Sequence, residues 1–277
     1  MVCQIGLLGA LELELSGGIN TLSWQPDKTA AYGSGKFEPF PYILGNMSIR
    51  GEIPRAWGFS VNIERDNIFQ NTIDFRLLTR TDYFGFEFGV FAGITDDFSI
   101  PDIGFIGNME ITWPNVMFFE LSSSSTVGSH FEMLGDNFRD SAGVKLGFWL
   151  PFAIPAFSLN SKSLTEFTDG QNPRTATLTR YQFDADFPFA KTSPVNMNLN
   201  GGYQILKKVY STDADEPSSL DELRSFYAGF ELLFKVSRPF HFFIGAEMPF
   251  VIEPVAPMTI SDDIMFKAWG GFKIIFY

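Results

Sequence analysis

Apolar and polar residues alternate along most of this chain with a period of two. Between residues 57 and 64, Trp57, Phe59 and Val61 fall on odd positions, while Gly, Ser, Asn and Glu fall on even ones. Successive side chains of a β-strand point to opposite faces of its sheet, so each such segment has one apolar and one polar face. The pattern recurs at 84–90 and 240–248. It predicts an all-β protein made of amphipathic strands.

About fourteen segments follow the alternation, and most are near the roughly 9–11 residues with which a tilted strand crosses a lipid bilayer. They lie near residues 10–20, 40–51, 55–65, 72–80, 83–94, 102–112, 115–123, 141–151, 156–164, 177–187, 194–207, 225–236, 239–251 and 264–277. Connections after even-numbered segments are short and mostly contain proline, as at Pro54, Pro114 and Pro239. Those after odd-numbered segments tend to be longer, as at 21–39 and 122–140. Short turns on one rim and long loops on the other are typical of outer-membrane barrels, which need an even strand number.

The apolar faces are strongly aromatic, because they carry most of the 32 phenylalanines. We expect lipid contact at Phe59, Phe75, Phe86, Phe105, Phe119, Phe148, Phe183, Phe230, Phe242 and Phe272. Further aromatic residues gather beside the short turns, as in the girdles that amphipathic rings form at a membrane–water boundary. No apolar run reaches ~18 residues, which excludes a transmembrane helix. The predicted fold class is therefore an all-β, transmembrane, antiparallel up-and-down β-barrel of about 14 strands, with 12 or 16 as alternatives.

Composition and net charge limit the number of domains and the classes of partner. Residues 11–277 form one predicted barrel domain, and residues 1–10 resemble the tail of a signal peptide, although the positively charged start is missing. The net charge of −12 argues against a nucleic-acid partner, because phosphates need Lys and Arg. Cys3 is the only cysteine, which excludes an intramolecular disulfide. No His or Cys cluster suggests a metal or another cofactor.

Charged residues fall on the parity opposite the aromatic stripe. The predicted channel-lining residues are Glu64, Arg76, Arg80, Glu87, Glu110, Lys145, Arg180, Asp184, Glu231, Lys235, Glu247, Lys267 and Lys273. In a barrel they face the lumen, since Lys or Arg on the lipid face costs about 2–4 kcal/mol at the membrane midplane. Glu87 is expected to pair with Arg76, and Glu14 with Lys273, which stabilises the wall.

One strand has a different inner face. It is a polar ladder of amides that consists of Asn196, Asn198, Asn200 and Gln204, with a glycine between. Amide groups both donate and accept hydrogen bonds. Such a ladder binds a sugar or another polar solute, or simply lines water.

The last strand resembles the C-terminal signal that the assembly machinery of bacterial outer-membrane proteins reads. In that signal a glycine is followed by a hydrophobic residue three positions on and an aromatic two further on, and Gly271, Ile274 and Phe276 match. The additional Tyr277 departs from it. The chain also resembles the small, monomeric, fourteen-stranded porins. The resemblance implies a bacterial outer membrane, contact with its lipid and the barrel assembly machinery, periplasmic termini and extracellular long loops.

These features favour a channel for passive diffusion of small polar solutes through a charged lumen, and not an enzyme. The alternatives are a surface-exposed binding or adhesion protein with a closed lumen, or a transporter of a hydrophobic ligand. His241 is predicted to face inward, without a local hydrolase motif. The loop Tyr210–Arg224 is acidic, which predicts weak cation selectivity, and a capping box at 219–222 predicts a helical turn in it.

Overall fold

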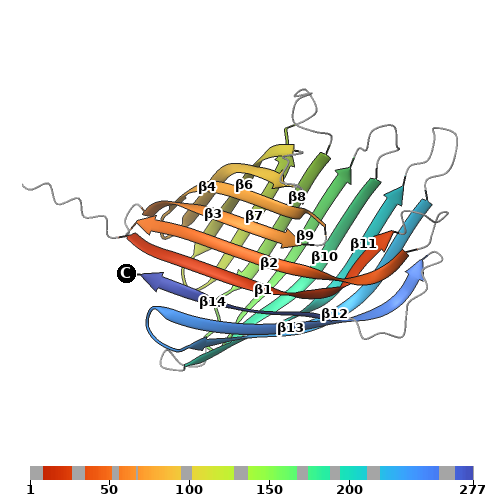
Figure 1. The fold of residues 1–277 in the computed structure, drawn as a ribbon. Coiled ribbons are helices and arrows are strands. Elements are labelled where there is room, and N and C mark those ends of the chain that lie inside the picture. Colours follow the sequence, from red (N-terminus) through yellow and green to blue (C-terminus); the bar gives the residue numbers. More distant parts are fainter. Residues whose placement is uncertain are drawn as a thin grey trace, which may run out of the picture.

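The computed structural model is a closed antiparallel β-barrel whose strands follow one another around the ring in chain order (Figure 1). It describes residues 9–26, 35–51, 56–66, 68–94, 102–127, 137–166, 174–187, 194–210, 219–255 and 266–276. Most of the predicted leader and parts of the long loops lie outside these ranges. No helix in the described part of the chain is long and apolar enough to cross a membrane.

Fourteen strands lie in the described part of the chain. They are β1 (Gly9–Pro26), β2 (Gly35–Gly51), β3 (Ala56–Asp66), β4 (Gln70–Arg80), β5 (Phe84–Ile94), β6 (Asp102–Trp113), β7 (Met117–Thr126), β8 (Asn137–Phe148), β9 (Ile154–Glu166), β10 (Arg174–Phe187), β11 (Val195–Tyr210), β12 (Ser219–Lys235), β13 (Phe240–Val255) and β14 (Lys267–Phe276). Each pairs with its chain neighbours, and β1 also pairs with β14 from Leu11↔Phe276 to Asn20↔Lys267, which closes the ring. The all-β, antiparallel, up-and-down prediction is confirmed.

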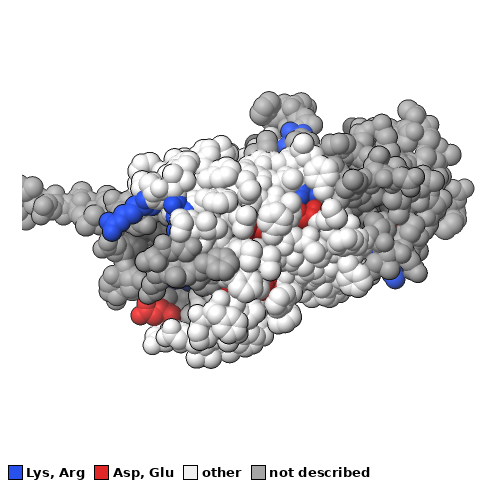
Figure 2. All heavy atoms as spheres, turned by 90° about the horizontal axis from the view of Figure 1, so that it is seen from below, with Lys and Arg blue, Asp and Glu red and all other residues white. Residues whose placement is uncertain are grey.

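Outward side chains form an apolar belt around the barrel. Among the phenylalanines predicted for this face, the exposed ones include Phe75, Phe86, Phe105, Phe183, Phe230 and Phe242. Their rings also contact one another across strands, as Phe88 and Phe105 stack with 5.9 Å between centroids. Figure 2 shows few Lys, Arg, Asp or Glu atoms on the described surface that it presents. An exposed apolar surface of this extent marks a membrane or partner contact.

Aromatic side chains mark the rim of short turns. Trp57, Tyr83, Trp113 and Trp149 lie there and are 63%, 64%, 47% and 40% exposed. The start of β1 and the end of β14 lie at the same rim (Figure 1). Rings with a polar N–H or O–H suit the boundary between an apolar medium and water.

A ladder of hydroxyl groups interrupts the apolar belt on β9 and β10. It consists of the pairs Ser161–Thr179, Ser163–Thr177 and Thr165–Thr175, whose oxygens are 3.3, 3.1 and 3.0 Å apart. These residues share the parity of the exposed Phe157 and Leu159, so they face outward, further from the short-turn rim. The outer surface of this wall therefore changes from apolar to polar along its strands.

Three segments predicted as loops are partly strand. β1 continues to Pro26 and β2 begins at Gly35, which shortens the predicted 21–39 loop. β7 continues to Thr126 and β8 begins at Asn137, which shortens the predicted 122–140 loop. β12 begins at Ser219, so the helical turn predicted at 219–222 is wrong, because these residues pair with β11. Glu222 and Arg224 share the parity of the exposed Phe226 and face outward. The acidic residues 211–218 lie outside the described residues.

At position 271, the seam between β14 and β1 has room for a glycine only. A Cβ on Gly271 would collide with the backbone oxygen of Leu15 and lie 2.7 Å from a ring carbon of Phe243. A Cβ on Gly270 would meet its nearest atoms, the oxygen of Phe243 and a methyl of Ile244, at 3.4 and 3.6 Å. Gly271 therefore has a structural role in closure, whatever the assembly machinery reads from it.

Gly271→Ala should reduce barrel closure, whereas Gly270→Ala should not. Overpacking of this kind costs roughly 1–3 kcal/mol. Purified chains refolded into lipid vesicles, without any assembly machinery, give the folded fraction as the heat-modifiable band on a gel. Equal folded fractions for the two variants would contradict the steric role of Gly271.

Candidate functional site: the inner wall

The inner wall of the barrel collects the residues predicted to line a channel. All thirteen lie on the face opposite the apolar belt, and so do the four amides of the polar ladder. Strand pairing places them, because residues directly opposite on paired strands share a face. Most of their charges are paired within the wall.

On one side of the wall, Arg76 of β4 connects two carboxylates. Its Nε lies 2.7 Å from Asp74 Oδ1, and its Nη1 lies 3.6 Å from Glu87 Oε2. Asn62 donates a further hydrogen bond of 2.6 Å to Asp74. The predicted pairing of Glu87 with Arg76 is confirmed.

The seam and the short-turn rim also carry ion pairs. Lys273 of β14 lies 2.6 Å from Glu12 and 3.8 Å from Glu14 of β1, so the predicted Glu14–Lys273 pair is confirmed. Near the rim, Arg80 Nη2 lies 2.7 Å from Glu110 Oε1. These pairs join neighbouring or nearby strands, as wall-stiffening contacts do.

Longer contacts connect strands that are not neighbours. Arg180 of β10 lies 2.7 Å from Glu247 of β13, and its guanidinium carbon lies 4.1 Å from the centre of the Tyr227 ring. Tyr227 also donates a 3.0 Å hydrogen bond to Gln182. In these contacts the side chains of Arg180, Tyr227 and Glu247 extend into the lumen and narrow it on this side.

One ion pair crosses the barrel. Lys162 Nζ of β9 lies 2.9 Å from Glu64 Oε1 of β3, and these strands are six places apart in the ring of fourteen. The Lys162 ammonium also lies 5.2 Å from the ring centre of Phe69, in the β3–β4 turn. Ile68 and Phe69 are 2% and 7% exposed, so this turn packs inside the barrel. The lumen is therefore constricted at the level of Lys162.

A buried arginine fixes this turn. Arg139 of β8 is fully buried and forms an ion pair with Asp102, which is 1% exposed. Its Nε donates a 3.0 Å hydrogen bond to the carbonyl oxygen of Phe69. Asp102 in turn accepts a 3.0 Å hydrogen bond from the Gly93 backbone N–H. Gly93 leaves room for the guanidinium, since a Cβ there would overlap Arg139.

Sequence reasoning missed Arg139, Asp102 and the inward turn. Arg139 lies in a segment predicted as loop, although its parity is that of Lys145 on the same strand. Several inward-facing aromatic residues were missed as well, because aromatic side chains were predicted to lie on the outer face. They are Phe91, Phe118, Tyr227, Phe243 and Trp269.

The polar ladder is organised by side chains around it. Asn198 donates a 2.5 Å hydrogen bond to Asp186, and Asn196 accepts one of 3.3 Å from Lys235. Further from the rim, Gln204 donates a 3.0 Å hydrogen bond to Ser225. Three of the four ladder amides are thus held by neighbouring side chains, whereas the buried Oδ1 of Asn200 has no hydrogen-bond partner among the described residues.

The surroundings of His241 and the grouping of metal-ligating residues bear on two further kinds of site. His241 is directly opposite Lys235 on one side and Lys273 on the other, rather than a serine or an acid. No group of three or more His, Cys, Asp or Glu within the described ranges could hold a metal ion.

A closed antiparallel barrel with an aromatic outside and a charged inside is the fold of bacterial outer-membrane β-barrel proteins. An outer membrane channel from Pseudomonas putida F1 matches over 97% of this chain and 95% of its own, at 9% identity and a TM-score of 0.51. OmpT, an outer membrane protein of Vibrio cholerae, matches over 97% and 96% at 8% identity and a TM-score of 0.47. An anion-selective porin from Comamonas acidovorans matches over 97% and 98% at 8% identity and a TM-score of 0.43. No protein-family model and no curated protein matches the sequence.

Arg139→Met should destabilise the barrel strongly, because it leaves the Asp102 carboxylate buried without its cation. Removing one partner of a buried ion pair costs about 3–5 kcal/mol. Adding Asp102→Asn should recover part of this loss, since the amide oxygen still accepts from Gly93. Urea unfolding in lipid vesicles, followed by tryptophan fluorescence, measures both variants. Additive losses in the double variant would mean that the pair is not coupled.

Proposed function

We propose that this protein is a bacterial outer-membrane channel through which small polar solutes diffuse. The arrangement of charges carries the proposal: the inner wall is lined with charged and amide groups, while the outer belt is apolar and aromatic. A membrane supplies the apolar surroundings that the belt needs, and water in the lumen solvates the wall. In this proposal the short-turn rim and both termini face the periplasm, and the long loops face the exterior.

Strand number is consistent with a narrow pore. Eight strands give a barrel filled with side chains, while sixteen to eighteen leave an aqueous channel. Fourteen lies between, so side chains decide whether water and solutes pass. We infer that the Glu64–Lys162 pair and Phe69 form the narrowest point, because they connect opposite walls.

The same contact favours a second candidate, a surface-exposed binding or adhesion protein with a closed lumen. An ion pair across the barrel and a buried turn are features that a closed lumen would also show. Conduction by the purified protein separates the two functions. A transporter of hydrophobic ligands is less well supported, because a wall lined with charged side chains offers little apolar surface to such a ligand.

Thiol labelling tests the two faces of the wall. In a Cys3→Ser background, Glu87→Cys and Glu231→Cys should react faster with a membrane-impermeant thiol reagent than their neighbours Phe86→Cys and Phe230→Cys. The first two side chains face the lumen, whereas the other two face the apolar belt. The reaction is followed by mass spectrometry in lipid vesicles. Equal rates within each adjacent pair would count against a lipid-facing belt.

Single-channel recording tests the constriction. Lys162→Ala should raise the conductance roughly two-fold or more, because the narrowest point dominates the resistance of a pore. Phe69→Ala should act in the same direction. Lys145→Ala is the matched control, because this substitution removes the same charge from the wall. The Lys145 ammonium lies 5.8 Å from the centre of the Phe118 ring on the neighbouring β7.

The outcomes of this recording assign the function. A larger conductance for the Lys162 and Phe69 variants alone supports a constriction at this level. Equal conductance in all variants places the narrowest point elsewhere. Absence of current from the folded wild type and from every variant replaces the channel with the binding or adhesion protein.

A further inference from the structure

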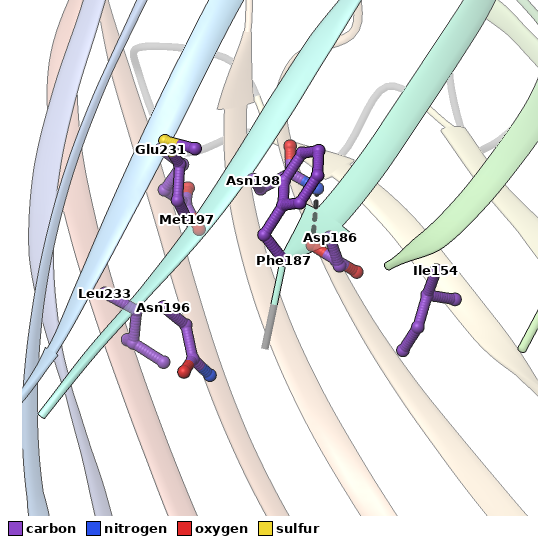
Figure 3. A pocket seen from close by; sticks show the side chains of 8 residues that line it. All are labelled: Ile154, Asp186, Phe187, Asn196, Met197, Asn198, Glu231 and Leu233. Atoms are coloured by element: carbon purple, nitrogen blue, oxygen red, sulfur yellow. Dashed lines mark hydrogen bonds between the residues drawn. The ribbon is translucent and has the colours of Figure 1, made fainter. Parts of the chain in front are cut away.

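A pocket lies in the barrel wall near the short-turn rim, between the ends of β9 to β12 (Figure 3). Its volume is ≈ 260 Å³. Asp186, Asn196, Asn198 and Glu231 supply its polar groups, and Ile154 and Leu233 supply apolar surface. Pockets for drug-sized ligands span about 300–1,000 Å³, so this one suits a smaller solute with a single ring.

Each polar group of the pocket is oriented by another side chain. Asn198 holds the Asp186 carboxylate by a hydrogen bond of 2.5 Å, which Figure 3 shows as a dashed line. The indole N–H of Trp269 holds Glu231 at 2.8 Å. Lys235 donates to the amide oxygen of Asn196 at 3.3 Å, which fixes the orientation of this amide and of its NH₂ donor group. Groups fixed in this way lose little entropy when a ligand binds.

The mixture of groups fits a particular chemistry. A sugar hydroxyl both donates and accepts hydrogen bonds, and its ring also presents C–H groups. The carboxylate oxygens of the pocket can accept hydrogen bonds from sugar hydroxyls, and the Asn196 NH₂ group can donate to hydroxyl oxygens. Ile154 and Leu233 offer apolar surface against which the C–H groups of a sugar ring can pack. We propose that this pocket binds a neutral polyhydroxylated solute of about one sugar ring.

Charge narrows the class of solute. Asp186 and Glu231 disfavour an anion, because like charges at short range repel. A cation is less suited than a neutral polyol, since the ammonium of Lys235, 3.3 Å from Asn196 Oδ1, already places a positive charge at the pocket. The inference deepens the proposed function and rests on it for the route by which a solute reaches the pocket.

Binding is tested without any need for current. Saturation-transfer difference NMR on the refolded barrel in detergent compares three probes with the same ring, which are methyl glucoside, glucosamine and glucuronate. We expect methyl glucoside to bind, and glucuronate to bind more weakly. The double variant Asp186→Asn/Glu231→Gln should weaken methyl glucoside binding about ten-fold, as expected when charged acceptors are replaced by amides.

Asp184→Asn is the matched control. It removes one of the wall's carboxylate charges two residues along β10, where Asp184 accepts a hydrogen bond of 2.6 Å from Gln182 and does not line the pocket. Unchanged binding in this variant, together with the loss in the double variant, supports the site. Three results would overturn the proposed site. They are tighter binding of glucosamine than of methyl glucoside, no binding of methyl glucoside, and an equal loss of binding in the double variant and in Asp184→Asn. If methyl glucoside binds as expected but the protein carries no current, the channel proposal fails and this site stands.

Discussion

The pairing of β1 with β14 is the contact on which the rest of this structure depends. Closure removes the free edges of the two end strands over the paired segment from Leu11↔Phe276 to Asn20↔Lys267, so their backbone groups find partners inside the sheet there. Closure also fixes which parity faces inward for the whole ring. A slip of one residue in a single ladder would exchange the aromatic and charged faces of that strand. The crowded glycine at position 271 shows how closely the two end strands approach.

Inside the ring, the charges act in pairs that differ in reach. Pairs such as Arg76–Asp74 keep to one stretch of wall, whereas Glu64–Lys162 spans the lumen. Arg139 adds a further level, because it fixes the turn against which Lys162 packs. Side chains that connect different strands through the lumen therefore brace this barrel from the inside. In the proposed channel, conductance then depends on a few side chains and not on strand number alone.

Period-two alternation was sufficient to predict most of each strand and the inward face of the thirteen predicted channel-lining residues. It could not reveal what each inward side chain touches. Trp269 and Phe118 have inward parity, yet an aromatic stripe predicts an outer face. Arg139 was hidden because the serine-rich stretch before it resembles a loop. The position of Phe69 inside the barrel depends on β8, 70 residues away, and no local pattern encodes such a contact.

The hydroxyl ladder on β9 and β10 has a mechanical consequence in the proposed membrane. From the short-turn rim, β9 presents Phe157 and Leu159 and then turns polar at Ser161, while β5 stays apolar from Phe84 to Val90. The apolar height of the barrel is thus uneven around its circumference. Bilayers respond to such hydrophobic mismatch by local thinning or by tilt of the embedded protein. If the barrel is embedded as proposed, these three pairs of Ser and Thr would help to set the inclination of its axis relative to the membrane normal.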